Sequence, residues 1–255
     1  MDRGTYIAAS GGLLEFKRLD IVNNNLANVN TPGFKRQVLV SSQRTFDETL
    51  ASRIELDDPY ALSDHERTPE AESQGAYTDF SPGPIRETGN ALDVALNNPK
   101  DFFVVNTPRG PEYTRAGSFT LSAEGALVTP DGHEVQGDGG TLTLQAGAVS
   151  ISANGAVMLD GAEVGRLQVV RFQDPSLLER VGGTRFRVPQ GAAAASETVE
   201  ADVVPRSLEM SNVSTVTSMI DLVAANRAFE MYEKTARTID ELNGTATQQI
   251  GRYIR

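Results

Sequence analysis

The sequence predicts an α+β protein, in which N- and C-terminal helices pair as a coiled-coil-like layer beside a central antiparallel β domain. Three observations support this: apolar residues at helical spacing near the start, short β-favouring runs between turn dipeptides in the middle, and a proline-free heptad stripe at the end. The predicted domains are residues 1–34, an N-terminal helical segment; 35–75, an extended acidic connector; 76–205, the central β domain; and 206–255, a C-terminal coiled-coil helix that completes the helical domain.

The first helix is predicted over residues 5–28. Ile7, Leu14 and Ile21 recur every seven residues, which is typical of one apolar face of a helix. The helix should end before Pro32, because proline disfavours helical backbone at the residue that precedes it.

Two polar stretches lie at the end of this predicted helix and in the connector after it. Five asparagines lie between positions 23 and 30, and they indicate either a fraying helix end or a row of side-chain amides that meets another subunit. Residues 47–72 hold nine acidic and two basic residues. Because the connector has no sustained hydrophobic period, we expect it to be extended and partly mobile.

The middle of the chain has the pattern of an antiparallel β domain. Short β-favouring runs alternate with the dipeptides Glu124-Gly125, Asp131-Gly132, Asn154-Gly155 and Asp160-Gly161, which suit turns that need a positive φ. Residues 191–200 lack an apolar stripe, so a surface loop is favoured there over a short helix. The expected strands lie at 102–105, 112–115, 127–128, 141–144, 167–170 and 186–188.

The last helix is expected to begin at Ser211 or Asn212, since either side chain could cap it, and to continue to the end of the sequence. A stripe of residues that are apolar except for Asn243 alternates at spacings of four and three, as in a coiled-coil seam. These residues are Ala225, Phe229, Tyr232, Ala236, Ile239, Asn243, Ala246, Ile250 and Tyr253. Upstream, Val213, Val216, Ile220 and Val223 keep the same rhythm on a shifted face, a discontinuity of the stutter kind.

Composition excludes several classes of protein. The absence of cysteine excludes disulfides, thiol nucleophiles and cysteine metal sites. A net charge of −11 argues against nucleic acid as a partner, because phosphate binding needs a basic surface. The first residues lack the basic and long apolar regions of a cleavable secretion signal, and no apolar run reaches membrane-spanning length, so we expect no direct membrane insertion.

Candidate catalytic and metal-binding residues are few. His65 lies between Asp64 and Glu66, but three adjacent side chains in a polar connector do not converge on one point, and His133 follows a turn. No motif singles out a pair of carboxylates, and the glycines of 132–147 lack phosphate-loop spacing. We therefore expect no enzymatic activity, cofactor or metal.

Two terminal motifs resemble those of the flagellar axial (rod and hook) family, and within it those of the rod proteins. Residues 24–35 read NNLANVNTPGFK, and residues 208–213 read LEMSNV, with ANRAFEM following at 225–231. Segments at 92–96, 113–119 and 125–129 agree as well. The resemblance spans nearly the whole chain and is weakest over 36–75.

This resemblance implies a structural subunit of the bacterial basal-body rod in the periplasm. It further implies a cylinder with the terminal helices inside and the β domains outside. The implied partners are further copies of the chain, adjacent proximal-rod and distal-rod subunits, and the flagellar type III export apparatus, whose use would explain the missing signal peptide. The expected subunit-interface residues are Ile7, Leu14, Ile21, Asn24, Asn25, Leu26, Asn28, Asn212, Val213, Arg227, Phe229, Tyr232, Ile239 and Ile250.

Among rod proteins, the segments 1–3, 79–85 and 164–167 look more like the proximal-rod subunit than the distal-rod one. The chain departs from the family pattern at 97–101, where a glycine-rich turn is common, and at Pro205-Arg206-Ser207, where a Gln-Gly pair is usual. The alternatives are a distal-rod or hook-type axial subunit, or an extracellular β-domain adhesin on a coiled-coil stalk.

Overall fold

A computed structural model of the protein describes residues 3–45, 69–145, 147–189 and 196–253. The chain forms two compact units. The helical unit comprises Met1–Leu26, Gln37–Tyr77 and Thr215–Arg255, and the β unit comprises Ala27–Arg36 and Thr78–Ser214. The predicted α+β class, with a largely antiparallel β domain between terminal helices, is confirmed.

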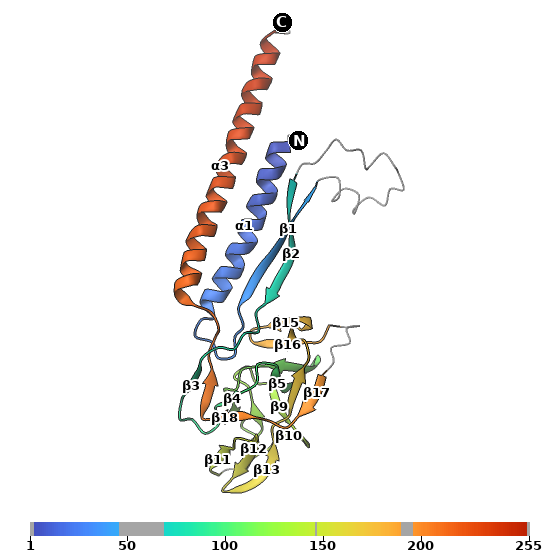
Figure 1. Cartoon of the computed structure of the whole chain (residues 1–255), viewed down its shortest axis with the longest axis vertical. Helices are drawn as coiled ribbons and strands as arrows, with labels where there is room; N and C mark the ends of the chain where they lie inside the picture. Colours follow the sequence, from blue (N-terminus) through green and yellow to red (C-terminus); the bar gives the residue numbers. More distant parts are fainter. Residues whose placement is uncertain (1–2, 46–68, 146, 190–195, 254–255) are drawn as a thin grey trace, which may run out of the picture. The chain divides into compact units, whose positions relative to one another are not determined.

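Two long helices, α1 (Arg3–Ala27) and α3 (Thr215–Tyr253), lie side by side in the helical unit (Figure 1). They run in opposite directions, since Gly4 lies against Ile239 near the start of α1 and Phe16 lies against Phe229 further along. In the part of the chain that is described, neither helix combines the length and apolarity needed to cross a membrane.

The end of α1 follows from local sequence, whereas the start of α3 does not. The helix α1 stops at Ala27, upstream of Pro32, as predicted. The prediction that Ser211 or Asn212 caps the second helix is wrong, because α3 begins only at Thr215. Both polar side chains bind backbone before the helix starts, so they are not available to it.

Strands β1 (Gln37–Thr45) and β2 (Pro69–Thr78) pair as a two-stranded sheet in the helical unit. They occupy the two ends of the segment predicted to be an extended connector. Most of the acidic stretch 47–72, including Asp64, His65 and Glu66, lies outside the described residues.

The β unit is built around a sheet in which the strands follow the order β15-β16-β6-β5-β9-β8-β7, with β10 beside β9, and with β14 between β5 and β17. All of these pairings are antiparallel. The strands are β5 (Asp101–Thr107), β6 (Gly110–Thr114), β7 (Thr120–Leu121), β8 (Leu127–Val128), β9 (Glu134–Gly137), β10 (Gly140–Thr141), β14 (Val169–Phe172), β15 (Glu179–Gly182), β16 (Arg185–Arg187) and β17 (Ser196–Val199).

Three smaller sheets complete this unit. A three-stranded sheet joins β11 (Val149–Ile151), β12 (Ala156–Leu159) and β13 (Ala162–Arg166). Two strand pairs join β4 (Val94–Leu96) to β18 (Val203–Pro205), and β3 (Ile85–Glu87) to β19 (Ser207–Glu209). The sequence just before α3 is therefore held by strands that lie more than a hundred residues upstream.

The strand β5 divides the apolar core in two. Phe103 and Val105 point into one buried cluster, while Phe102 and Val104 point into the other. This follows from the alternation of side chains along a strand. Both faces of β5 are thus covered, which explains why its sequence is a continuous apolar run rather than an alternating one.

The positive φ expected at the turn dipeptides is confirmed, whereas part of one predicted loop is a strand. Gly125, Gly132 and Gly155 all have a positive φ, as the Glu-Gly, Asp-Gly and Asn-Gly pairs indicate. The predicted surface loop at 191–200 is wrong for Ser196–Val199, which form β17 and pair with β14. Alternation is hard to recognise in a four-residue edge strand with three exposed positions, and here pairing to β14 determines the structure.

The departure from the family pattern at Arg206 has a structural counterpart, since this exposed residue has a φ of 54°. A left-handed backbone costs a residue with a Cβ about 1–2 kcal/mol, and glycine adopts it without that cost. The Arg206 carbonyl oxygen accepts bonds from the backbone N–H groups of Thr88 and Gly89, which fix the strained turn.

We therefore expect Arg206→Gly to be more stable than Arg206→Ala by about 0.5–1 kcal/mol, because relief of strain exceeds the added entropy of the unfolded chain. Urea unfolding of the two variants measures this difference. The alanine variant is the matched control, since it removes the same guanidinium but keeps a Cβ. Equal free energies of unfolding would contradict a strained backbone at this position.

Candidate assembly surfaces and their polar junction

The two terminal motifs meet inside the β unit. The backbone N–H of Gly33 donates to the Glu209 carbonyl oxygen at 2.8 Å. Gly33 has a φ of 70°, and a Cβ on it would lie 2.3 Å from the backbone nitrogen of Ala116. Only glycine fits there, so the Pro-Gly step near the end of the first motif also allows the chain to approach the second motif.

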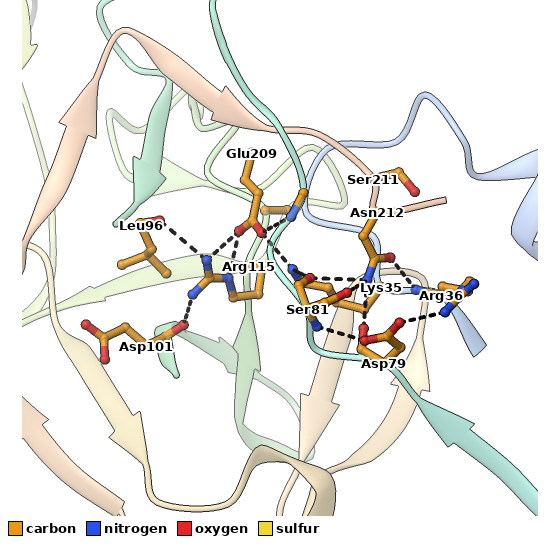
Figure 2. A network of polar contacts seen from close by, with 12 residues as sticks. Lys35, Arg36, Asp79, Ser81, Leu96, Asp101, Arg115, Glu209, Ser211 and Asn212 are labelled. Carbon is orange, nitrogen blue, oxygen red and sulfur yellow. Dashed lines mark hydrogen bonds and ion pairs between the residues drawn. The ribbon is translucent and has the colours of Figure 1, made fainter. Parts of the chain in front are cut away.

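A buried triad of charges forms the centre of this junction (Figure 2). The Lys35 ammonium lies 2.6 Å from Glu209 Oε1, and the guanidinium of Arg115 binds Glu209 Oε2 through Nε at 2.8 Å. All three side chains are at most 1% exposed. Arg115 also donates to the carbonyl oxygens of Leu96, Asn98 and Asp101. One carboxylate thus links both ends of the chain to its middle.

The electrostatics of the triad follow from burial and pairing. Burial alone would raise the pKa of Glu209, but the two cations and a bond from the Gly83 N–H outweigh it, so this pKa is lowered. Burial lowers the pKa of Lys35, and the attraction of Glu209 opposes that effect. Glu209 binds both buried cations, and the Ser81 carbonyl oxygen accepts a further hydrogen bond from Lys35 at 2.7 Å.

Two asparagines of the motifs bind backbone within the chain. Asn212 accepts a bond from the Arg36 N–H at 2.7 Å and donates to the carbonyl oxygens of Asp79 and Ser81 (Figure 2). In the helical unit, the buried Asn25 accepts from the Gln37 N–H and donates to the Gln37 carbonyl oxygen. Each side-chain amide accepts a bond from a backbone N–H and donates to a backbone carbonyl oxygen, as the backbone of a neighbouring strand does.

Arg180 also contacts the first motif, at Phe34 and Lys35. Its guanidinium lies 4.6 Å from the centre of the Phe34 ring and 5.2 Å from that of Phe186. It also donates to the carbonyl oxygens of Lys35 and Gly183. Burial lowers the pKa of Arg180 to about 10, a value at which it stays charged near neutral pH.

In the helical unit, the face of α3 that meets α1 carries the predicted seam. Ala225 is fully buried, and the rings of Phe229 and Phe16 lie 6.1 Å apart. A Cβ on Gly11 would lie 2.4 Å from the Tyr232 ring, so a glycine lets this ring lie against α1. The seam therefore contacts α1 at Phe229 and Tyr232, whereas a regular coiled-coil geometry remains a prediction.

This helix pair leaves an open groove of about 380 Å³. The side chains that line it are apolar except for Glu233. Leu13 and Phe16, on the α1 side, are 58% and 49% exposed. One chain therefore leaves part of its helical apolar surface exposed.

The structure places the predicted interface residues in several environments. Asn25 and Val213 are buried; Leu14, Ile21, Leu26, Asn28, Asn212, Phe229 and Ile239 are half-buried; Ile7, Asn24, Arg227 and Tyr232 are exposed. The side chain of Ile250 lies outside the described residues. Their role between subunits stays a prediction. Sequence reasoning missed Glu209 and Arg115 as partners of Lys35, although all three lie in the motifs that were singled out.

No group of three or more metal-binding side chains occurs among residues that the structure describes. His133 instead contacts the Arg185 guanidinium, which also binds the buried Glu112. The polar contacts described above thus join segments of the same chain to one another. A β unit that contains the contact between both terminal motifs, together with a helix pair that leaves apolar surface exposed, is typical of a structural subunit.

Comparison with known proteins agrees with this class. Residues 6–35 match the flagella basal body rod protein family, residues 98–159 the flagellar hook protein FlgE/F/G D1 domain, and residues 204–249 the flagellar basal body rod FlgEFG protein C-terminal family. A flagellar basal-body rod protein FlgF of Caulobacter vibrioides is 32% identical over 255 residues, which cover 99% of each chain.

Two further relatives are similar over comparable lengths. FlgG of Caulobacter vibrioides is 31% identical, over 94% of this chain and 97% of its own, and FlgF of Salmonella typhimurium is 30% identical, over 98% and 99%. The chain belongs to the flagellar basal-body rod protein family. The resemblance seen in the terminal motifs, and the structural role in the rod that it predicted, are confirmed.

Proposed function

We propose that the chain is a proximal-rod subunit that polymerises through its terminal helices to form the drive shaft and its axial export channel. The observation that supports this most directly is the exposed apolar surface of the helical unit, which needs a partner outside the chain. In this proposal the helical unit forms the inner layer and the β unit the outer one.

The proposed partners are further copies of the chain and the adjacent proximal-rod and distal-rod subunits. We also propose that the chain reaches the periplasm through the flagellar type III export apparatus without a cleavable signal peptide. A cysteine-free sequence suits passage as an unfolded chain, because no disulfide has to be avoided or broken. Of the seven seam positions whose side chains the structure describes, only Ala225 is buried, and the other six are left to be covered on assembly.

Locating a tagged, functional copy in isolated basal bodies tests the proposal. We expect it in the rod segment nearest the inner membrane, released together with other proximal subunits. A copy found only in the distal segment or in the hook would favour the alternative of a distal-rod or hook-type axial subunit. A tagged chain absent from basal bodies, in cells that require it for motility, would contradict a rod position altogether.

A further inference from the structure

The chain passes from the β unit to the helical unit between Arg36 and Gln37, at the first residue of β1. Hinges between compact units are commonly found at such places, where a regular element begins or ends. Hydrogen bonds decide whether this link can turn, because the φ and ψ of each residue are the only soft torsions of a backbone. Every backbone N–H and carbonyl oxygen of the two residues is hydrogen-bonded.

On the side of the β unit, Arg36 is bound by two neighbouring segments (Figure 2). Its N–H donates to Asn212 Oδ1 at 2.7 Å, and its carbonyl oxygen accepts from the Asp79 N–H at 2.8 Å. The amide of Asn212 also donates to the Asp79 carbonyl oxygen at 2.9 Å, which ties the two segments to each other. Both torsions of Arg36 therefore lie between bonds made within one unit.

On the side of the helical unit, one buried amide binds Gln37. Asn25 is 5% exposed; it accepts from the Gln37 N–H at 2.9 Å and donates to the Gln37 carbonyl oxygen at 2.8 Å. Because little water reaches this amide, a broken bond is not replaced and leaves a buried polar group without a partner. Both torsions of Gln37 thus lie between two bonds to Asn25.

These two sets of bonds share one peptide group. The carbonyl of Arg36 and the N–H of Gln37 belong to the same plane, which turns as a rigid body. Its oxygen is bound within the β unit, and its N–H is bound within the helical unit. A rotation of this plane strains bonds in both units at once, so we expect the bonds to open together.

We infer that Asn25 and Asn212 hold the Arg36–Gln37 link in one conformation, so that it does not act as a hinge. Each asparagine comes from one of the two terminal motifs. In this role the two amides act within one chain rather than between copies. The link is held in the free chain, before any copy meets another, so it does not depend on the place of the chain in the rod.

Amide hydrogen exchange of the purified full chain tests whether the two sets of bonds are coupled. We expect Asn212→Ala to speed exchange of the Arg36 amide about tenfold, because that amide loses its acceptor. The Gln37 amide should speed up as well, although its own acceptor, Asn25, is unchanged. Asn154→Ala is the matched control, since Asn154 accepts a backbone bond within a turn of the β unit. It should leave both amides as protected as before.

A Gln37 amide that exchanges equally slowly in Asn212→Ala and in the unmodified chain would show two independent contacts and overturn the inference. The reciprocal variant decides the matter if Asn212→Ala does not fold. In Asn25→Ala the Arg36 amide should speed up, although its acceptor is intact. An unchanged Arg36 amide in that variant would overturn the inference in the same way.

Spin labels measure whether the link turns. The sequence has no cysteine, so Glu124→Cys and Glu241→Cys, both at exposed positions, place one label in each unit. We expect a narrow distribution of label distances in the otherwise unmodified chain, and a wider one when Asn25→Ala and Asn212→Ala are added. Equal widths in the two chains would overturn the inference. A tagged chain absent from basal bodies would refute the rod position and leave the held link standing.

Discussion

Glu209→Gln is expected to lower the free energy of unfolding by about 3–5 kcal/mol, because it leaves two cations buried without a counter-charge. Lys35 and Arg115 are both almost fully buried, and each lies within 3 Å of the Glu209 carboxylate. Glutamine keeps the size of the side chain and can still accept hydrogen bonds. The loss therefore reports charge rather than packing, and urea unfolding measures it.

Glu179→Gln is the matched control for this substitution. Glu179 is exposed on β15 and contacts Arg187 at 3.2 Å on the surface, where an ion pair contributes about 0–1 kcal/mol. The control should therefore unfold close to the unmodified chain. If Glu209→Gln behaved like the control, the triad would not stabilise the junction.

The pH dependence of the unfolding free energy, compared between the unmodified chain and Glu209→Gln, provides a second test. Because the pKa of Glu209 is lower in the folded state than its ordinary value of 4.5, its stabilising effect is fully present above that pH. The effect is lost as the pH falls through the folded pKa. The difference in unfolding free energy between the unmodified chain and Glu209→Gln should thus narrow below pH 4.5, and a constant difference would contradict the assignment.

Phe229→Asp combined with Tyr232→Asp is expected to abolish incorporation into the rod and motility. Both side chains contact α1 and line the groove. Each large apolar side chain contributes about 1.5–3 kcal/mol when buried, and a buried aspartate adds a desolvation cost of similar order. A polymer repeats the defect at every copy, so assembly should fail even where one subunit tolerates it.

Phe229→Leu with Tyr232→Phe is the control, since it keeps both positions apolar and should assemble. Neither residue belongs to the β unit, so the double aspartate variant should retain the β circular dichroism signal and its unfolding transition. The amount of tagged chain in purified basal bodies is the measurement. Normal amounts of the aspartate variant would show that this seam is not needed for assembly.

Local signals in the sequence were sufficient for much of the fold. The end of α1 before Pro32 and the positive φ of Gly125 and Gly132 depend on neighbouring residues only. Pairing between distant segments could not be predicted from such local signals. The strand β17 forms because β14 lies beside it, and Asn212, a good cap by type, is drawn to Arg36 and other backbone far along the chain.

The polar junction shows the same limit at the candidate site. Lys35 and Glu209 each stood in a recognised motif, yet no spacing rule connects residues 174 positions apart, and Arg115 is another 94 positions from Glu209. The sequence shows that Lys35 stands at the end of the first motif, between Phe34 and Arg36. It does not show which carboxylate neutralises it, because that choice depends on the tertiary fold.

This separation along the chain also bears on the order of events in folding. Closing a loop of such length costs chain entropy before any contact compensates for it, so contacts of this kind form late. Loss of Glu209 should then leave the refolding rate almost unchanged and appear as faster unfolding. The buried triad would act chiefly on how long the β unit stays folded once it has formed, which is a kinetic rather than an equilibrium property.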